Sequence, residues 1–267
     1  MDYQKELEFA KTLAVEAGEV MRRYFAAEDM GLSMKDDDSP LTIADTTINT
    51  MVIERVKAEF PQDGVIGEEE SYETDRERVW VVDPVDGTIP FSLGMPVSTF
   101  LLALVNKHDG QPVVAVVYDP YLEQMYTAVV GEGAFLNGKK LVVTDETAFP
   151  SSYISVYGME STNETTHYDP DAVMKILRQK GFRNFGFASG AYTMVRVADG
   201  ALSFAVTGEP AKAWDIAAPA LIVMEAGGIV TDVAGNPRRY DQAGFGSIFA
   251  PNQATHQELL RIIKETA

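Results

Sequence analysis

The feature that most restricts the fold is a short apolar run that leads directly into two aspartates. Residues 79–82 read Val-Trp-Val-Val, which is typical of a buried strand, and Asp-Pro-Val-Asp-Gly-Thr follows at 83–88. Two carboxylates three residues apart at a strand end can converge on one cation. Gly87 lets the backbone approach a ligand, and the Gly87 and Thr88 amides can open a short helix that faces a phosphate. The alternative interpretation is a solvated Asp-Gly turn, and this motif alone leaves both open.

Three further acidic segments lie where the chain changes direction. They are Gly-Glu-Glu-Glu at 67–70, Trp-Asp-Ile-Ala-Ala-Pro at 214–219 and Pro-Leu-Thr-Ile-Ala-Asp at 40–45. Each also has an ordinary structural interpretation, because adjacent glutamates are usually solvated and an aspartate at a helix start is usually a cap. We expect Asp215 to be the N-cap of its helix, because Pro219 then falls in the first turn, where its missing N–H has no partner to lose. The functional interpretation is that these carboxylates gather around metal ions.

Hydrophobic periodicity divides the chain into two halves, because strands cluster before residue 145 and alternate with helices after it. We therefore predict an α+β N-terminal lobe over residues 1–145, which carries most of the metal ligands, and an α/β C-terminal lobe over residues 146–267. The predicted helices are 2–28, 44–60, 170–180, 190–198, 215–226 and 253–265. The predicted strands are 79–82, 97–106, 112–119, 124–130, 183–187, 201–207, 228–232 and 246–250. Asn-Gly at 137–138 predicts a tight turn.

The charge balance argues against several classes of partner. The chain has 22 basic and 40 acidic side chains, a net charge of −18, whereas nucleic acid and anionic membranes require a basic surface. No cysteine is present, which excludes disulfides and thiolate metal ligands. The N-terminus is polar and acidic, unlike a signal peptide, and the apolar runs are shorter than a membrane span. The expected location is the cytoplasm.

Taken together, these segments resemble the inositol monophosphatase family. The matching motifs are Gly-Glu-Glu at 67–69, Asp-Pro-Val-Asp-Gly-Thr at 83–88, and Trp-Asp-Ile-Ala-Ala at 214–218 with Glu-Ala-Gly-Gly at 225–228. They occur in the family's order and at about its spacing. Lys35 and Asp45 also fall about where the family places a lysine and a loop aspartate. The resemblance implies an α/β fold, a layered α-β-α-β-α sandwich with a Mg²⁺ cluster between the lobes.

The resemblance also implies a set of ligands for two or three Mg²⁺ ions. Glu68, Asp83 and the Val85 carbonyl would hold one ion, and Asp83, Asp86 and Asp215 would hold a second. A looser third ion would contact Glu68. Carboxylate and carbonyl oxygens are the hard ligands that Mg²⁺ prefers. One ion would activate a water molecule, and another would stabilise the leaving alkoxide.

The same resemblance assigns catalytic and substrate-binding residues. Thr88, paired with Asp45, would orient or deprotonate the attacking water, and Glu69 would assist. The expected substrate contacts are Gly87, Thr88, Ser189, Glu209 and Lys212. The small-molecule partner is therefore expected to be a phosphate ester. Members of the family are often homodimers, so the resemblance also implies a homodimer, and it implies sensitivity to Li⁺.

Two departures from the family pattern concern the substrate. Ile-Pro-Phe follows at 89–91, where the family commonly has a small polar residue. Gly208 stands where the family places its inositol-binding glutamate, with Glu209 beside it and Lys212 closer to Asp215. The expected substrate is inositol 1-phosphate or a similar sugar or polyol phosphate. Histidinol phosphate and fructose 1,6-bisphosphate are the alternatives.

Two other classes of protein fit less of the sequence. Haloacid-dehalogenase-type phosphatases have Asp-x-Asp-Gly-Thr after a strand, but Pro84 and Val85 both separate the aspartates here, which misplaces the acid relative to the nucleophile. A non-catalytic protein that binds metal or phosphate ester is expected to have lost Thr88 or Asp45, and both are present.

We predict that millimolar Mg²⁺ raises the melting temperature of the metal-free protein. Four clustered carboxylates repel one another, and a cation that binds only the folded site stabilises it. Three ions would change the local charge from about −4 to about +2, so that a phosphate dianion can bind despite the net charge of −18. Thermal melts with EDTA and with Mg²⁺ test this, and an unchanged midpoint would contradict it.

Overall fold

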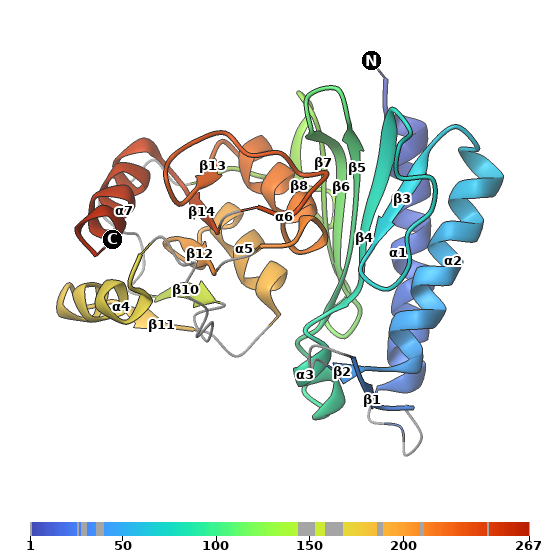
Figure 1. The fold of residues 1–267 in the computed structure, drawn as a ribbon, viewed down its shortest axis with the longest axis horizontal. Helices are drawn as coiled ribbons and strands as arrows, with labels where there is room; N and C mark the ends of the chain where they lie inside the picture. Colours follow the sequence, from blue (N-terminus) through green and yellow to red (C-terminus); the bar gives the residue numbers. More distant parts are fainter. Residues whose placement is uncertain are drawn as a thin grey trace.

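The strand expected at residues 79–82 lies inside a sheet of seven strands (Figure 1). The structure is a computed structural model that describes residues 2–25, 27, 31–35, 40–143, 153–157, 168–185, 189–208, 211–244 and 246–266. In this sheet β3 and β4 are parallel and every later neighbour is antiparallel. Its strands in order are β3 (Gly64–Gly67), β4 (Arg78–Asp86), β5 (Thr99–Asn106), β6 (Gln111–Asp119), β7 (Gln124–Val129), β8 (Gly133–Leu136) and β9 (Lys139–Leu141).

Both faces of this sheet are covered by helices. The helices of the described chain are α1 (Gln4–Tyr24), α2 (Ile43–Glu59), α3 (Thr88–Ser92), α4 (Pro170–Gln179), α5 (Gly190–Ala198), α6 (Ala213–Glu225) and α7 (Gln253–Glu265). Because successive strand residues point to opposite faces, Trp80 and Val82 pack with α1 and α2, whereas Val79 and Val81 pack with α5 and α6. This two-sided burial explains why residues 79–82 form a continuous apolar run.

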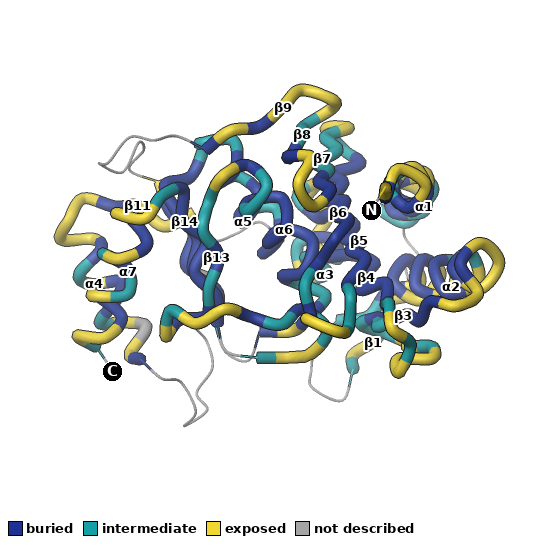
Figure 2. The backbone as a smooth tube through the Cα atoms, turned by 90° about the horizontal axis from the view of Figure 1, so that it is seen from above, coloured by how far each residue is buried: buried dark blue, intermediate teal, exposed yellow. Residues whose placement is uncertain are grey.

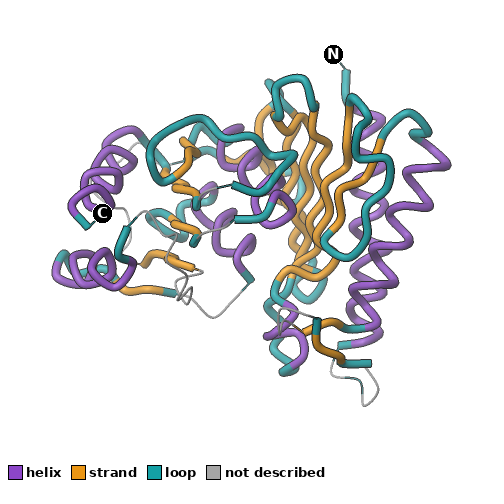
Figure 3. Tube along the Cα trace, in the orientation of Figure 1, coloured by secondary structure: helices purple, strands orange, loops and turns teal. Residues whose placement is uncertain are grey.

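A second sheet of five strands lies on the far side of α5 and α6. Its strands in order are β11 (Arg183–Asn184), β10 (Tyr153–Tyr157), β12 (Ala205–Thr207), β14 (Ser247–Ala250) and β13 (Ile229–Asp232). The outer face of this sheet packs with α4 and α7. The layers therefore alternate α-β-α-β-α, as expected, and α5 and α6 form the buried middle layer (Figures 2 and 3).

Most predicted elements are confirmed within a few residues, but some bounds differ and several strands, among them β8 and β9, were not predicted. Strand β4 continues through Asp86 rather than ending at Val82, and β12 begins at Ala205 rather than at residue 201. Strand β10 was not expected, although its sequence, Tyr-Ile-Ser-Val-Tyr, consists mainly of aromatic and β-branched residues that favour strands. The turn at Asn137-Gly138 is confirmed, since both residues have positive φ (48° and 77°) and join β8 to β9.

The predicted boundary between the lobes falls at residue 145, which lies outside the described residues, so the division at 145/146 stays a prediction. A small ladder of β1 (Ser33–Met34) and β2 (Pro40–Leu41) precedes α2. Among the described helices, none combines the length and apolar character needed to cross a bilayer.

We predict that Gly18→Val destabilises the fold by about 1–3 kcal/mol, because α1 packs closely on β6. A Cβ atom at Gly18 would lie 2.6 Å from Cε1 of the buried Tyr118 and 3.0 Å from Cβ of Pro120. Glu19→Val is the matched control, since Glu19 is the exposed neighbour on the same helix. Urea unfolding of both variants measures the difference, and equal free energies of unfolding would contradict the close contact.

Candidate active site

The parallel pairing of β3 and β4 brings two acidic segments to one edge of the sheet. Gly67 is in register with Val82, so Glu68 and Asp83 follow at adjacent positions. The Glu68 N–H also donates to the Val82 carbonyl at 3.2 Å. Glu70 is exposed, which matches the solvated-patch interpretation for that residue alone.

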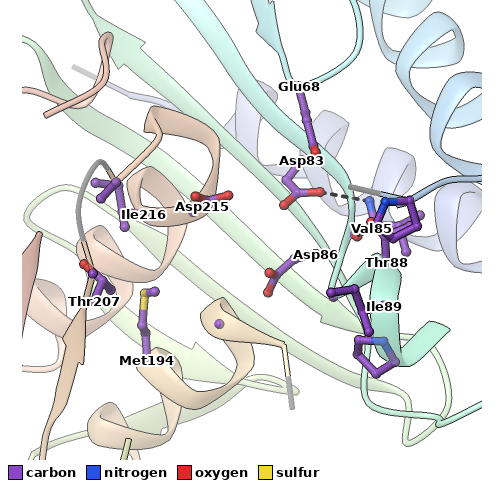
Figure 4. A pocket seen from close by; sticks show the side chains of 16 residues that line it. Glu68, Asp83, Val85, Asp86, Thr88, Ile89, Met194, Thr207, Asp215 and Ile216 are labelled. Carbon is purple, nitrogen blue, oxygen red and sulfur yellow. Dashed lines mark hydrogen bonds between the residues drawn. The ribbon is translucent and has the colours of Figure 1, made fainter. Parts of the chain in front are cut away.

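An irregularity at the end of β4 allows Asp83 and Asp86 to face the same cavity. Residues three apart in a regular strand point to opposite faces, but the pairing of β4 with β5 shifts register between these two aspartates. The Asp83 Oδ1 atom accepts a hydrogen bond from the Val85 N–H at 3.0 Å, which turns the chain locally (Figure 4). Both aspartates are almost fully buried and line the cavity.

Gly87 joins β4 to α3 in a conformation that other residues rarely adopt. Its φ is +86°, in the left-handed region, and it is the N-cap of α3. A Cβ atom here would lie 2.9 Å from Cβ of Ser189, which belongs to the loop before α5. Any side chain at residue 87 would therefore push the sheet edge away from α5.

Asp86 is the carboxylate that connects the sheet edge to the middle helical layer. Its Oδ2 atom accepts a hydrogen bond from the Ala191 N–H at 2.8 Å and lies 3.3 Å from Thr99 Oγ1. Ala191 is in the first turn of α5, where backbone N–H groups have no partner within the helix. Ser189 caps this turn by accepting from the Tyr192 N–H at 3.0 Å.

Asp215 reaches the cavity from α6, but it is not the N-cap that we expected. The helix begins at Ala213 with Lys212 as the extended N-cap, so Asp215 is the third helical residue and accepts a hydrogen bond from the Lys212 backbone. Pro219 consequently lies inside the helix. Because proline has no N–H, it cannot form the helical bond to the Asp215 carbonyl. The sequence prediction was wrong because an acid in the first turn and an N-cap acid leave the same pattern.

Thr88 and Asp45 form the predicted pair. The Thr88 Oγ1 atom lies 3.4 Å from Asp45 Oδ1 and donates to the Val85 carbonyl at 3.1 Å. Asp45 is fully buried at the start of α2, where its other oxygen accepts from the Thr42 N–H at 2.8 Å and from the Thr42 hydroxyl. This reciprocal capping fixes the carboxylate beside Thr88.

Lys35 contacts two of the predicted acidic residues directly. Its Nζ atom lies 2.6 Å from Glu68 Oε1 and 2.6 Å from Glu69 Oε1. Burial alone would lower the pKa of Lys35, but the hydrogen bonds and negative charges of the two glutamates outweigh it and raise that pKa. The ammonium group therefore stays charged and neutralises part of the acidic cluster.

A cavity of about 300 Å³ lies between the sheet edge and the α5–α6 layer. Glu68, Asp83, Asp86, Thr88 and Asp215 line it, together with the backbone at Val85. Figure 4 shows Glu68, Asp83 and Thr88 on one side and Asp215 on the other, with Asp86 between them. Four carboxylates from three segments of the sequence thus share one space.

The residues expected to contact the substrate lie in different places relative to the cavity. Gly87 and Thr88 line the cavity. Ser189 does not: it is fully buried, and its Oγ atom lies 3.1 Å from Thr99 Oγ1, so its contact with a substrate stays a prediction. Lys212 is exposed and also does not line the cavity. Glu209 lies outside the described residues.

The three aspartates of the cavity have raised pKa values. Burial raises the pKa of Asp83 well above its ordinary value, and the charges of Glu68, Asp86 and Asp215 raise it further. Burial raises the pKa of Asp86 to about 6, although hydrogen bonds from Ser189, Ala191 and Thr99 oppose the shift. Burial, followed by the charges of Asp86 and Glu68, raises the pKa of Asp215 to about 8. The site accordingly favours the binding of positive charge.

The donor set fits Mg²⁺ by its chemistry, because it consists of carboxylate and carbonyl oxygens only. In the described part of the chain, however, no three acidic or histidine side chains already converge closely enough to hold one ion. Asp83 Oδ1 accepts a hydrogen bond from the Val85 N–H, and Glu68 is paired with Lys35.

Two residues that support the site were missed in the sequence. Asn49, buried on α2, donates to the Glu70 carbonyl at 2.9 Å and accepts from the Glu69 N–H at 3.4 Å, so it holds the glutamate segment in place. Thr99 on β5 contacts Asp86. A polar residue on an otherwise apolar helix face was the available signal for Asn49, whereas Thr99 is an ordinary strand residue by sequence.

Comparison with known proteins assigns the family. The model of the inositol monophosphatase family matches residues 2–266. Inositol monophosphatase 1 of Bos taurus is 34% identical over 244 residues, which cover 88% of this chain and 86% of the bovine protein. A fructose-1,6-bisphosphatase/inositol-1-monophosphatase of Aquifex aeolicus is 30% identical and covers 98% of this chain and 96% of its own length. A histidinol-phosphatase of Streptomyces coelicolor is 29% identical, with 99% and 98% covered.

Solved structures give the same fold. The IMPase of Thermotoga maritima superposes with a TM-score of 0.84 at 26% identity and covers 98% of both chains. An IMPase/NADP phosphatase solved with Mg²⁺ and phosphate has a TM-score of 0.82 at 23% identity, with 97% of this chain and 95% of that chain covered. Fold and site thus define a phosphoric monoester hydrolase of a metal-dependent class. The chain belongs to the inositol monophosphatase family.

We predict that the metal-free protein loses stability as the pH rises from about 5 to about 8. The pKa of Asp215 is about 8 in the folded chain against an ordinary value of 3.8. Between these values the folded chain keeps a proton that the unfolded chain releases, so the free energy of unfolding falls with rising pH and levels off above the folded pKa. Asp215→Asn removes this contribution and should flatten the dependence.

Urea unfolding in EDTA at a series of pH values measures the effect. Asp171→Asn, at an exposed position of α4, is the control for loss of one acid. Equal pH dependence in the wild type and in Asp215→Asn would contradict the raised pKa.

Proposed function

We propose that this chain hydrolyses a small phosphate monoester with Mg²⁺ as cofactor, through direct attack of water. The observation that carries the proposal is the convergence of Glu68, Asp83, Asp86 and Asp215 on one cavity beside Thr88. These carboxylates and the Val85 carbonyl would hold two or three ions. Neutralising the cluster is what allows an anionic ester to enter a cavity lined by acids.

Thr88 and Asp45 are the proposed catalytic pair. Bound Mg²⁺ would supply the Lewis acidity that lowers the pKa of water and stabilises the leaving alkoxide. The Thr88 hydroxyl, 3.4 Å from Asp45 Oδ1, can orient the attacking water. It can accept a proton from that water while it donates its own proton to the Asp45 carboxylate. Burial raises the pKa of Asp45, which favours acceptance of the proton. Burial likewise raises the pKa of Glu69, which supports an assisting role.

The Gly87 and Thr88 amides are the proposed donors to the phosphoryl oxygens. The first hydrogen bond inside α3 is from the Phe91 N–H to the Gly87 carbonyl at 3.0 Å, so the amides before it have no partner within the helix. Fixed N–H groups of this kind stabilise charge that develops on phosphoryl oxygens. No covalent phosphoenzyme is required.

The proposed substrate is inositol 1-phosphate or a similar sugar or polyol phosphate. The names of the bovine and Aquifex relatives support this choice. Histidinol phosphate and fructose 1,6-bisphosphate are the alternatives, supported by the names of the Streptomyces and Aquifex relatives. Direct contact of Glu209 or Lys212 with the substrate also belongs to this proposal.

The remaining expectations concern assembly and location. We propose a homodimer by analogy with the family, and we also propose a cytoplasmic location. The net charge of −18 supports the proposal that neither nucleic acid nor membrane is a partner. The proposed lobes are 1–145 and 146–267.

We predict that Asp86→Asn lowers kcat/KM by roughly 10²–10³-fold or more, because it removes a charge that faces the metal site. Phosphate release is measured with and without Mg²⁺ for inositol 1-phosphate, histidinol phosphate, fructose 1,6-bisphosphate and phosphoadenosine phosphate. Asp75→Asn, in the exposed loop before β4, controls for loss of one acid. Full activity of Asp86→Asn would refute the assignment.

The variant Thr88→Val tests whether Thr88 is needed for the chemical step but not for the binding of Mg²⁺. Calorimetric titration should show Mg²⁺ affinity near that of the wild type, whereas turnover should fall. Thr88→Ser keeps the hydroxyl and should recover part of the rate. A trapped aspartyl phosphate in the wild type would favour the covalent alternative and overturn the direct attack of water.

A further inference from the structure

Arg238 carries a guanidinium group that is almost completely buried next to one wall of the cavity. The residue is 6% exposed and lies in the segment between β13 and β14. Its Nη2 atom donates to the Ala211 carbonyl at 3.0 Å, and its Nη1 atom donates to Ser247 Oγ at 3.1 Å. Ala211 lines the cavity, whereas Arg238 does not. Burial of a charge costs free energy unless hydrogen bonds compensate it, so these contacts hold the guanidinium in place.

The same guanidinium is connected to both ends of the segment 208–210. Ala211 follows this segment and accepts directly from Arg238. Thr207 precedes it, and the Thr207 Oγ1 atom accepts from the N–H of Ser247 at 2.7 Å, the residue whose hydroxyl accepts from Arg238. Thr207 and Ala211 both line the cavity. The planar fork of one arginine thus fixes the separation of two residues of the wall.

Gly244 packs against both Ala211 and the guanidinium. The Ala211 N–H donates to the Gly244 carbonyl, and the Gly244 N–H donates to the Ala211 carbonyl, both at 3.0 Å. A Cβ atom at Gly244 would lie 3.2 Å from Arg238 Nη2 and 3.4 Å from its Cζ atom. A side chain at residue 244 would therefore displace the guanidinium from Ala211.

The backbone that carries Arg238 is attached to the sheet that supplies Asp83 and Asp86. The loop between β13 and β14 reaches this sheet (Figure 1), where Gln111 Nε2 donates to the Arg238 carbonyl at 2.8 Å. The Tyr240 N–H donates to the Gly110 carbonyl at 2.8 Å. The backbone of Arg238 is thus held by the first sheet, while its side chain holds the wall formed by the second lobe. It sets the distance between the acidic end of the cavity and that wall.

We infer that Arg238 is a positioning residue for the alcohol part of the substrate. It holds Thr207 and Ala211, and through Ala211 the adjacent Lys212, at a fixed place relative to the acidic end. The inference rests on the proposed function. Asp83 and Asp86 accept hydrogen bonds from the Val85 and Ala191 N–H groups, so loss of the guanidinium leaves these supports of the acidic end in place.

Arg238→Met tests this role, because it removes the guanidinium fork and keeps an unbranched apolar side chain. We expect KM for inositol 1-phosphate to rise by roughly tenfold, whereas kcat changes by less than about threefold, since a contact made equally in the ground state and the transition state affects KM alone. The inhibition constant of inorganic phosphate should stay within about twofold of the wild-type value, because phosphate by itself occupies only the acidic end.

The neighbouring arginine provides a matched control. The Arg239 side chain is 40% exposed, pairs with Asp241 at 2.8 Å and donates to the Lys107 carbonyl, so Arg239→Met should leave KM unchanged. Arg238→Lys keeps a charged donor without the fork and should recover part of the lost affinity. Gly244→Ala displaces the guanidinium without removing it and should raise KM in the same direction.

The two constants separate positioning from a general loss of structure. An unchanged KM in Arg238→Met overturns the inference, and so does an equal rise in KM and in the inhibition constant of phosphate. If Arg238→Met does not fold, Gly244→Ala decides the matter by the same two constants.

A measurement without turnover distinguishes failure of this inference from failure of the proposed function. If the wild type hydrolyses no ester, the proposed function fails, and acrylamide quenching of tryptophan fluorescence decides the inference. Trp80 is fully buried, whereas Trp214, three residues after Ala211, is partly exposed and reports on this wall. Stronger quenching in Arg238→Met than in Arg239→Met supports the positioning role, and equal quenching overturns it.

Discussion

The repulsion among Glu68, Asp83, Asp86 and Asp215 is the constraint on which the rest of the structure depends. Four carboxylates in one cavity oppose folding unless something compensates them: burial raises the pKa of Asp83, Asp86 and Asp215, and neighbouring negative charges raise it further. The chain supplies three partial compensations. Lys35 bridges Glu68 and Glu69, the first turn of α5 donates to Asp86, and the Lys212 backbone donates to Asp215. These contacts do not neutralise all the negative charge of the four carboxylates. The remaining charge is what allows the cavity to bind cations.

The same contacts join the layers of the fold. Asp86 ends strand β4 and accepts a hydrogen bond from the Ala191 N–H in α5, 105 residues later in the sequence. Gly87 sits against Ser189 so closely that no side chain fits between them. The cavity thus lies where the sheet edge approaches α5 and α6.

The cavity is lined by both acidic and aliphatic side chains. At one end of the cavity lie the carboxylates and the Thr88 side chain, which contacts Asp45. Ile89, Met194 and Ile216 also line the cavity. Relatives of similar identity carry phosphatase names with different substrates, so the fold alone does not fix the substrate.

The sequence by itself determined the strand at 79–82, the helices that cover it, the acidic segments and the family. These are local patterns of burial and turn chemistry, and each is complete within a few residues. It did not determine that β4 runs on to Asp86 or that α6 begins before Asp215, because an N-cap acid and a first-turn acid look alike in one dimension. Only the tertiary structure showed the bond of Lys35 to Glu68 and Glu69, the burial of Ser189 and the support from Asn49 and Thr99. Such contacts join residues far apart in the chain, and their energy depends on distance and burial, which a sequence does not contain.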